Sequence, residues 1–109
     1  MAYDEGVAQR LREALGSRDD VVEKRMFGGI AFMVRGHMCV GVIGESMMAR
    51  VGPARYTDAL RRAHAREMDF TGRPMTGFVH VAPEGFEADT AFRDWVALCL
   101  DFVATLPRR

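Results

Sequence analysis

The chain has 109 residues, with fifteen basic and fifteen acidic side chains, so its formal net charge is zero. This length suits one domain with a real hydrophobic core, and the balanced charge gives no overall field that attracts nucleic acid or an anionic membrane. The first residues lack the basic and apolar pattern of a leader, and no run approaches about eighteen apolar residues. We therefore predict a single domain over residues 1–109 that is cytoplasmic and does not bind a membrane.

The two cysteines, Cys39 and Cys99, lack the paired spacing of a zinc ribbon or a redox motif, which fits a reducing compartment. Both stand among apolar neighbours, so we interpret them as core residues rather than nucleophiles. His37, Cys39 and His80 could converge as metal ligands. A turn position for His37 and a core position for Cys39 explain these residues better. The sequence therefore predicts no metal and no cofactor.

The first half of the chain predicts a helix followed by strands. Asp4 and Glu5 precede apolar residues at helical spacing, and Gly16 follows them. From Val21 to Val51 the apolar period changes to two, in four short runs. The connectors between these runs are Gly28-Gly29, Gly36-His37 and Gly44-Glu45-Ser46. Because connectors this short favour tight reversals, we expect four strands in an antiparallel meander.

The second half predicts a helix, a strand and a last helix. Gly52-Pro53 ends the strand pattern and starts a helix, since proline is tolerated at the first helical position. A looser segment then leads to a fifth strand over residues 77–82, and Asp89 or Thr90 can cap a final helix with a strong apolar stripe. The predicted fold is α+β, in the order α-β(4)-α-β-α, with helices packed on an antiparallel sheet.

Several short motifs occur along the chain in a characteristic order. They are Tyr3-Asp4-Glu5-Gly6, Lys24 to Gly29, Met38 to Val42, Arg50-Val51-Gly52 and Met68 to Met75. In these motifs the chain resembles the N-terminal domain of the TfoX/Sxy family over nearly its whole length. The resemblance implies a secretion-chaperone-like α+β domain that is often paired as a dimer. Family members include regulators of natural competence that carry a second, C-terminal domain, and we expect this domain to stand alone.

The motifs do not bring a nucleophile, a base and an oxyanion donor together, so we predict no enzymatic activity. The resemblance, together with the predicted exposed sheet, points to a non-enzymatic regulatory domain that acts through protein–protein contacts as a homodimer. Most of the eight methionines are interpreted as core residues, with one or two on an exposed sheet face of such a dimer.

A small anion- or ligand-binding domain, or a small enzyme that uses Arg50, Asp69 and Arg73, is one alternative. Lys24, Arg50, Asp69 and Arg73 are the polar members of the motifs. Arg50 and Arg73 could hold a carboxylate or phosphate through their planar guanidinium groups, with Asp69 orienting one of them. We favour a structural interpretation, in which Asp69 pairs with an arginine and holds an irregular segment in place.

Nucleic-acid binding is a further alternative. The one local excess of basic side chains lies on or after the second predicted helix and consists of Arg55, Arg61, Arg62, His64 and Arg66. These side chains could contact phosphates. A solvated helix face explains them more simply, because Asp58 and Glu67 dilute the charge and no aromatic side chain is interleaved to stack on bases.

Overall fold

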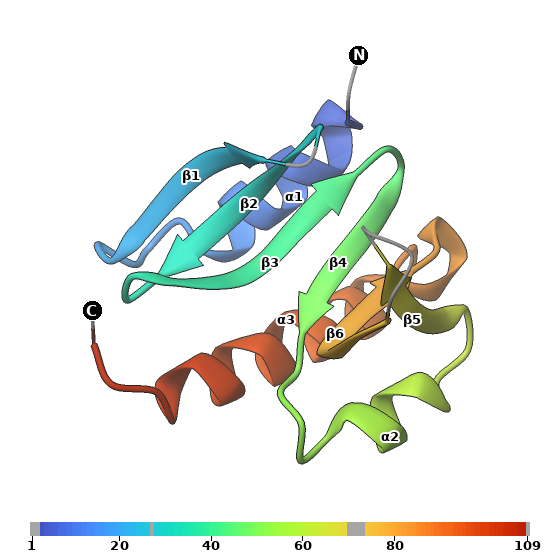
Figure 1. Ribbon diagram of the computed structural model, residues 1–109. Coiled ribbons are helices and arrows are strands. Elements are labelled where there is room, and N and C mark those ends of the chain that lie inside the picture. Colours follow the sequence, from blue (N-terminus) through green and yellow to red (C-terminus); the bar gives the residue numbers. More distant parts are fainter. Residues whose placement is uncertain (1–2, 27, 70–73, 109) are drawn as a thin grey trace.

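The computed structural model describes residues 3–26, 28–69 and 74–108. In chain order the elements are α1 (Glu5–Ala14), β1 (Val21–Met26), β2 (Gly29–Val34), β3 (His37–Ile43), β4 (Ser46–Arg50), α2 (Tyr56–Leu60), β5 (Ala65–Asp69), β6 (Pro74–Val81), the 3₁₀ turn η1 (Pro83–Gly85) and α3 (Asp89–Ala104). The strands form one antiparallel sheet in the order β1-β2-β3-β4-β6-β5 (Figure 1). The predicted α+β class and the meander of the first four strands are confirmed.

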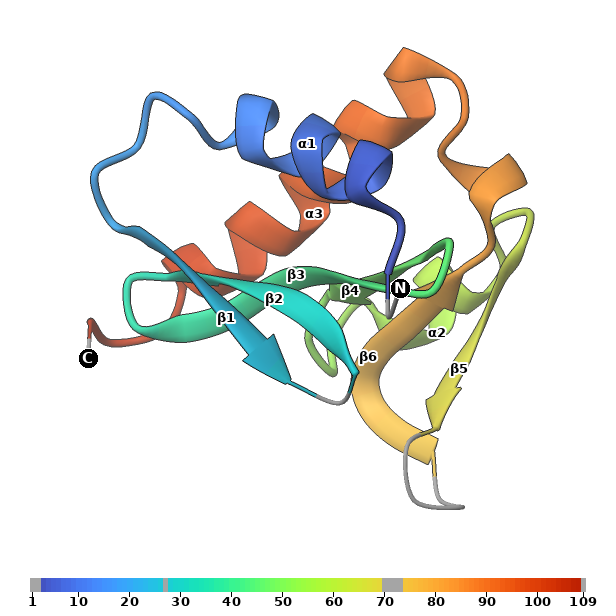
Figure 2. The same cartoon turned by 90° about the horizontal axis from the view of Figure 1, so that it is seen from above.

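Helices α1 and α3 lie together on one face of the sheet (Figure 2). Helix α1 begins as predicted, because Asp4 accepts a hydrogen bond from the backbone N–H of Val7 at 3.1 Å. The cap predicted for α3 is wrong: the N-cap residue is Ala88, and no side chain caps the helix. Asp89 lies instead in the first turn of α3, where its carboxylate is 3.3 Å from Arg10 of α1. No helix in the described ranges is long and apolar enough to cross a membrane.

The reversals between β2, β3 and β4 are tight, as predicted, but the turns are Arg35-Gly36 and Gly44-Glu45. The turn position predicted for His37 is therefore wrong, because this residue begins β3, and Ser46 begins β4. Arg35 and Gly36 both have positive φ, 57° and 84°, which matches the right-handed twist of the strands that they join. Gly44 opens the next reversal with φ 57°. These turns keep β2, β3 and β4 in register at the centre of the sheet.

The region between β4 and α3 differs from the prediction in two ways. Helix α2 has only five residues, and the segment expected to be loose contains an additional strand, β5, at the edge of the sheet. In β5 only Met68 is buried, so the strand carries little of the apolar alternation by which strands are detected. The predicted fifth strand is the longer β6. Residues 70–73, which include Arg73 of the predicted ligand set, lie outside the described residues.

The pairing register divides the strand residues between two faces, because residues directly opposite each other share a face. The face toward α1 and α3, here called the helix-covered face, is fully buried along β2, β4 and β6. A bulge interrupts β3: Phe32 pairs with Val40 and Met33 with Met38, which leaves Cys39 as an extra residue. Met38 therefore does not share a face with Val40, although strict alternation predicted that it would.

Candidate functional site

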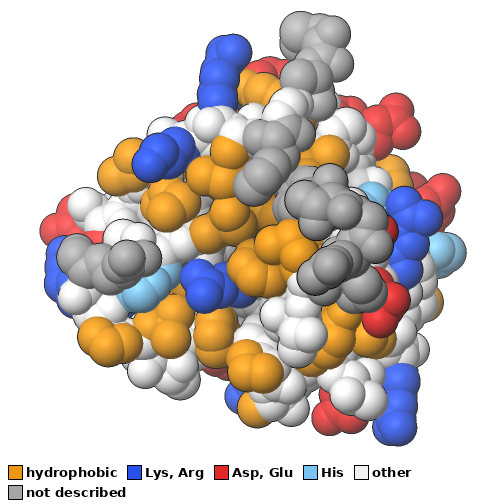
Figure 3. Space-filling view, in the orientation of Figure 1, with side chains coloured by type: hydrophobic (Ala, Val, Ile, Leu, Met, Phe, Trp, Pro, Cys, Tyr) orange, Lys and Arg blue, Asp and Glu red, His pale blue; other side chains and the backbone are white. Residues whose placement is uncertain are grey.

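The face of the sheet away from α1 and α3, here called the open face, carries apolar side chains from every strand. By register and alternation it holds Val22, Lys24, Met26, Ala31, Met33, Met38, Gly41, Ile43, Met48, Arg50, Arg66, Met68, Phe78 and His80. Figure 3 views the molecule from this side and shows hydrophobic side chains gathered over the middle strands. Five of the eight methionines of the chain are in this set.

The open face is apolar without being covered by a described helix. Val22 is 63% exposed, the highest value for a large hydrophobic side chain among the described residues. Met33 and Met38 are half-buried, and Met48 and Met68 are buried although they lie outside the main core cluster. Figure 2 shows β5 and β6 turning away from the helices, so the open face is concave. Methionine side chains in such a position form an adaptable apolar surface.

Arg50 lies within this apolar surface. Its guanidinium is 5.3 Å from the ring centres of both Phe78 and Phe102, and it donates a hydrogen bond to the backbone carbonyl of Met38 at 3.2 Å. Cation–π contacts and a bond to the backbone hold this arginine in place. The arrangement joins β4, β3 and α3, which is consistent with a structural role for Arg50.

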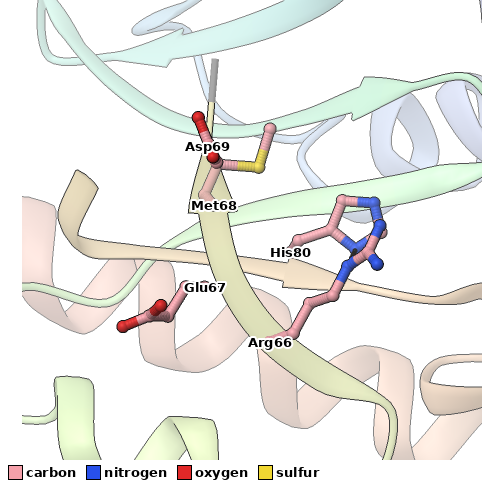
Figure 4. Close-up of a pocket in the computed structure, with 5 residues that line it drawn as sticks. All are labelled: Arg66, Glu67, Met68, Asp69 and His80. Carbon is pink, nitrogen blue, oxygen red and sulfur yellow. Dashed lines mark hydrogen bonds between the residues drawn. The ribbon is translucent and has the colours of Figure 1, made fainter. Parts of the chain in front are cut away.

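A pocket of about 450 Å³ opens where β5 and β6 meet, lined by Arg66, Glu67, Met68, Asp69 and His80 (Figure 4). Arg66 Nε donates to Nδ1 of His80 at 3.2 Å. Burial, together with the nearby Arg66 charge, lowers the pKa of His80, so the imidazole is neutral at pH 7. The Glu67 side chain points away from the Arg66 and His80 pair in Figure 4. The pocket thus offers one guanidinium and a neutral imidazole beside Asp69, without a converging pair of carboxylates.

The structure places the predicted ligand residues in separate parts of the sheet. Lys24 lies on the edge strand β1, Arg50 on the inner strand β4, and Asp69 on the opposite edge strand β5. Lys24 and Asp69 therefore cannot hold one small ligand together. Asp69 shares its pocket with Arg66 and His80, neither of which was in the predicted ligand set.

The basic residues proposed for nucleic acid have different neighbours. Arg55 lies 3.4 Å from Asp101, and Arg61 lies 3.8 Å from Asp58. The guanidinium of Arg62 is 5.1 Å from the centre of the Trp95 ring. Arg66 belongs to the open face. These four arginines therefore do not form one unpaired basic surface.

The cysteines and histidines of the described residues also do not form one site. Cys39 and Cys99 are both fully buried, and a hydrogen bond between the two thiols, together with burial, raises the pKa of the Cys99 thiol. Their interpretation as core residues is confirmed. His37 begins β3, and its Nε2 lies 2.6 Å from the Pro107 carbonyl oxygen. Within the described part of the chain, no three His, Cys, Asp or Glu side chains could together hold a metal ion.

Sequence reasoning did not identify the open face as a continuous surface. A usable signal was present: β2 and β4 carry apolar residues on both faces, with Ala31, Met33 and Met48 between the core positions. A strand that is apolar on both faces is buried on both or has an unpartnered face. The pairing of Arg66 with His80 had no such signal, because it depends on a strand that was not predicted.

Comparison with protein families matches residues 13–103 of the chain to the TfoX N-terminal domain. This match covers more than half of the 109 residues. Comparisons with curated proteins and with solved structures gave no match.

Proposed function

The chain belongs to the TfoX N-terminal domain family, and we propose that it is a non-enzymatic, cytoplasmic regulatory domain that acts by binding protein through its open face. The observation that carries the proposal is the apolar surface over β1, β2 and β3, with Val22 exposed and Met33 and Met38 half-buried. An apolar patch that water contacts is costly to maintain unless another surface covers it in use. Regulation of competence, to which the resemblance to TfoX/Sxy points, is the setting in which we expect this binding.

The homodimer is a second part of the proposal, and it rests on the family resemblance. Strand β1 supports it, because one of its edges has no strand neighbour within the described residues. Antiparallel pairing of two β1 edges about a two-fold axis would leave both open faces on the same side. Sedimentation equilibrium would then give a mass close to twice the 12.2 kDa of one chain.

The test of the proposal compares two substitutions that each add one carboxylate. Met33→Glu places it on the open face, whereas Ala97→Glu places it on the exposed side of α3, on the other side of the molecule. Affinity capture from native lysate, with nuclease treatment, should recover a defined set of proteins with the wild-type chain. We expect Met33→Glu to lose that set and Ala97→Glu to retain it, while both variants keep the wild-type circular dichroism spectrum.

Two results would contradict the proposal. If Met33→Glu captured the same proteins as the wild type, the open face would be excluded as the binding surface. A monomer in sedimentation, combined with no captured protein, would exclude the interaction domain as a whole. Loss of the captured material on nuclease treatment would favour nucleic acid instead.

A further inference from the structure

We infer that the protein partner presents an amphipathic helix whose apolar stripe is flanked by carboxylates. This inference rests on the proposed function and specifies the chemistry of the partner. It comes from the distribution of charge around the apolar centre of the open face. The register places three cations on this face, Lys24, Arg50 and Arg66, and one carboxylate at its β5 end, that of Asp69 opposite Pro74.

Two of the three cations lie at the borders of the apolar surface, and Arg50 lies inside it. Lys24 is exposed on the edge strand β1, and Arg66 is exposed on β5 at the other edge, while the methionines of β2, β3 and β4 lie between them. Asp69 lines the same pocket as Arg66, so Lys24, Arg66 and Asp69 together leave one net positive charge on the two borders. An apolar surface with a cationic border complements an apolar stripe with an acidic border.

The dimensions of the sheet suit one helix. Neighbouring strands are about 4.8 Å apart, so the six strands span on the order of 24 Å from β1 to β5. A helix with its side chains is about 10–12 Å wide, which leaves roughly 6 Å on either side for the Lys24 and Arg66 side chains to reach its flanks. The flexible methionines of this face suit contact with the apolar stripe of a helix.

The same charges argue against a second copy of the chain on the open face. In a two-fold arrangement with the two open faces in contact, the Lys24, Arg50 and Arg66 cations of one copy would approach those of the other. Like charges brought together across an interface oppose association. A homodimer is therefore better placed at an edge, such as that of β1, with the open face free for a different protein.

Two synthetic peptides of 18 residues test this inference. Both carry the same leucine stripe at helical spacing, one flanked by glutamates and the other by lysines, and each is labelled for fluorescence anisotropy. We expect the glutamate peptide to bind the wild-type protein at least tenfold more tightly than the lysine peptide, with an affinity that falls as salt is raised. The double variant Lys24→Glu/Arg66→Glu should reverse this preference.

A matched double variant controls for net charge. Arg61→Glu/Arg93→Glu makes the same change of charge at exposed positions outside the open face, and it should keep the wild-type preference. Equal binding of the two peptides, or a preference that survives Lys24→Glu/Arg66→Glu, would overturn the inference. If Met33→Glu still abolishes capture of proteins in that case, the proposed function stands and only the acidic helix is excluded.

Discussion

The two faces of the sheet are built from the same strands and differ in what covers them. On the helix-covered face, Phe32 and its neighbours are fully buried beneath α1 and α3. On the open face, Met33 is half-buried and Val22 is largely exposed. Both faces are apolar, so composition alone does not distinguish them.

The comparison shows that the type of apolar residue on each face matches whether its packing neighbours are permanent. Branched and aromatic side chains with fixed rotamers dominate the helix-covered face, where the neighbours are permanent. Flexible methionines are frequent on the open face, where the side chains would have to adapt to the shape of a binding partner. The helix-covered face accordingly supports folding, and the open face is available for binding.

The largest expected effect comes from a matched pair on β2. Phe32→Ala should destabilise the protein by about 3–5 kcal/mol, because it leaves a cavity beneath the helices. Met33→Ala, at the next residue and on the other face, should cost less than about 1 kcal/mol because this side chain is already half in water. Urea denaturation of the two variants measures both values. Equal losses would mean that the open face is packed as a second core.

A smaller effect is expected at Gly52, in the junction between β4 and α2, where the backbone lies close to Phe102 of α3. Gly52 has φ +84°, and a Cβ at this position would collide with the ring of Phe102, which also packs against Arg50. Gly52→Ala should therefore destabilise the protein by about 1–3 kcal/mol. Thermal unfolding checks this value. Gly28→Ala is the control for conformation alone, because it has positive φ but no atom within 4 Å of the added Cβ.

Much of the fold follows from the sequence because short turns and period-two patterns are local properties. A tight reversal at Gly36 and the strands around it were predicted for that reason, although the turn is Arg35-Gly36 rather than the predicted Gly36-His37. Strand β5 could not be predicted, since Met68 is its single buried residue and its stability comes from pairing with β6. The bulge at Cys39 was equally inaccessible, because it is defined by the partner strand.

The candidate site was less predictable than the fold. Arg50, Asp69 and Lys24 were selected for their place in sequence motifs, whereas the open face is defined by register across six strands. The sequence groups Arg66 with a basic cluster, whereas in the structure it donates a hydrogen bond to His80 and lines a pocket with Asp69. The order of the strands decides which charged side chains border the open face. That order includes β5, which the sequence did not predict.

The smallest expected effect on stability comes from two substitutions on opposite faces of β1, Glu23→Gln and Lys24→Gln. Glu23 points to the helix-covered side and forms two bonds with Arg12, at 2.6 and 2.8 Å, whereas Lys24 borders the open face. Because this bridge is partly exposed, Glu23→Gln should cost about 0.5–1 kcal/mol at pH 7, and Lys24→Gln should change stability by less than about 0.5 kcal/mol.

The effect at Glu23 should also depend on pH in one direction. Arg12 holds the pKa of Glu23 below its ordinary value in the folded protein. The carboxylate therefore contributes stability above its unfolded pKa, and that contribution is lost as the pH falls through the folded pKa. The difference in unfolding free energy between the wild type and Glu23→Gln should be constant near pH 7 and should shrink toward zero in acid. A difference that stayed constant into acid would mean that the glutamate acts through packing on α1 rather than through its charge.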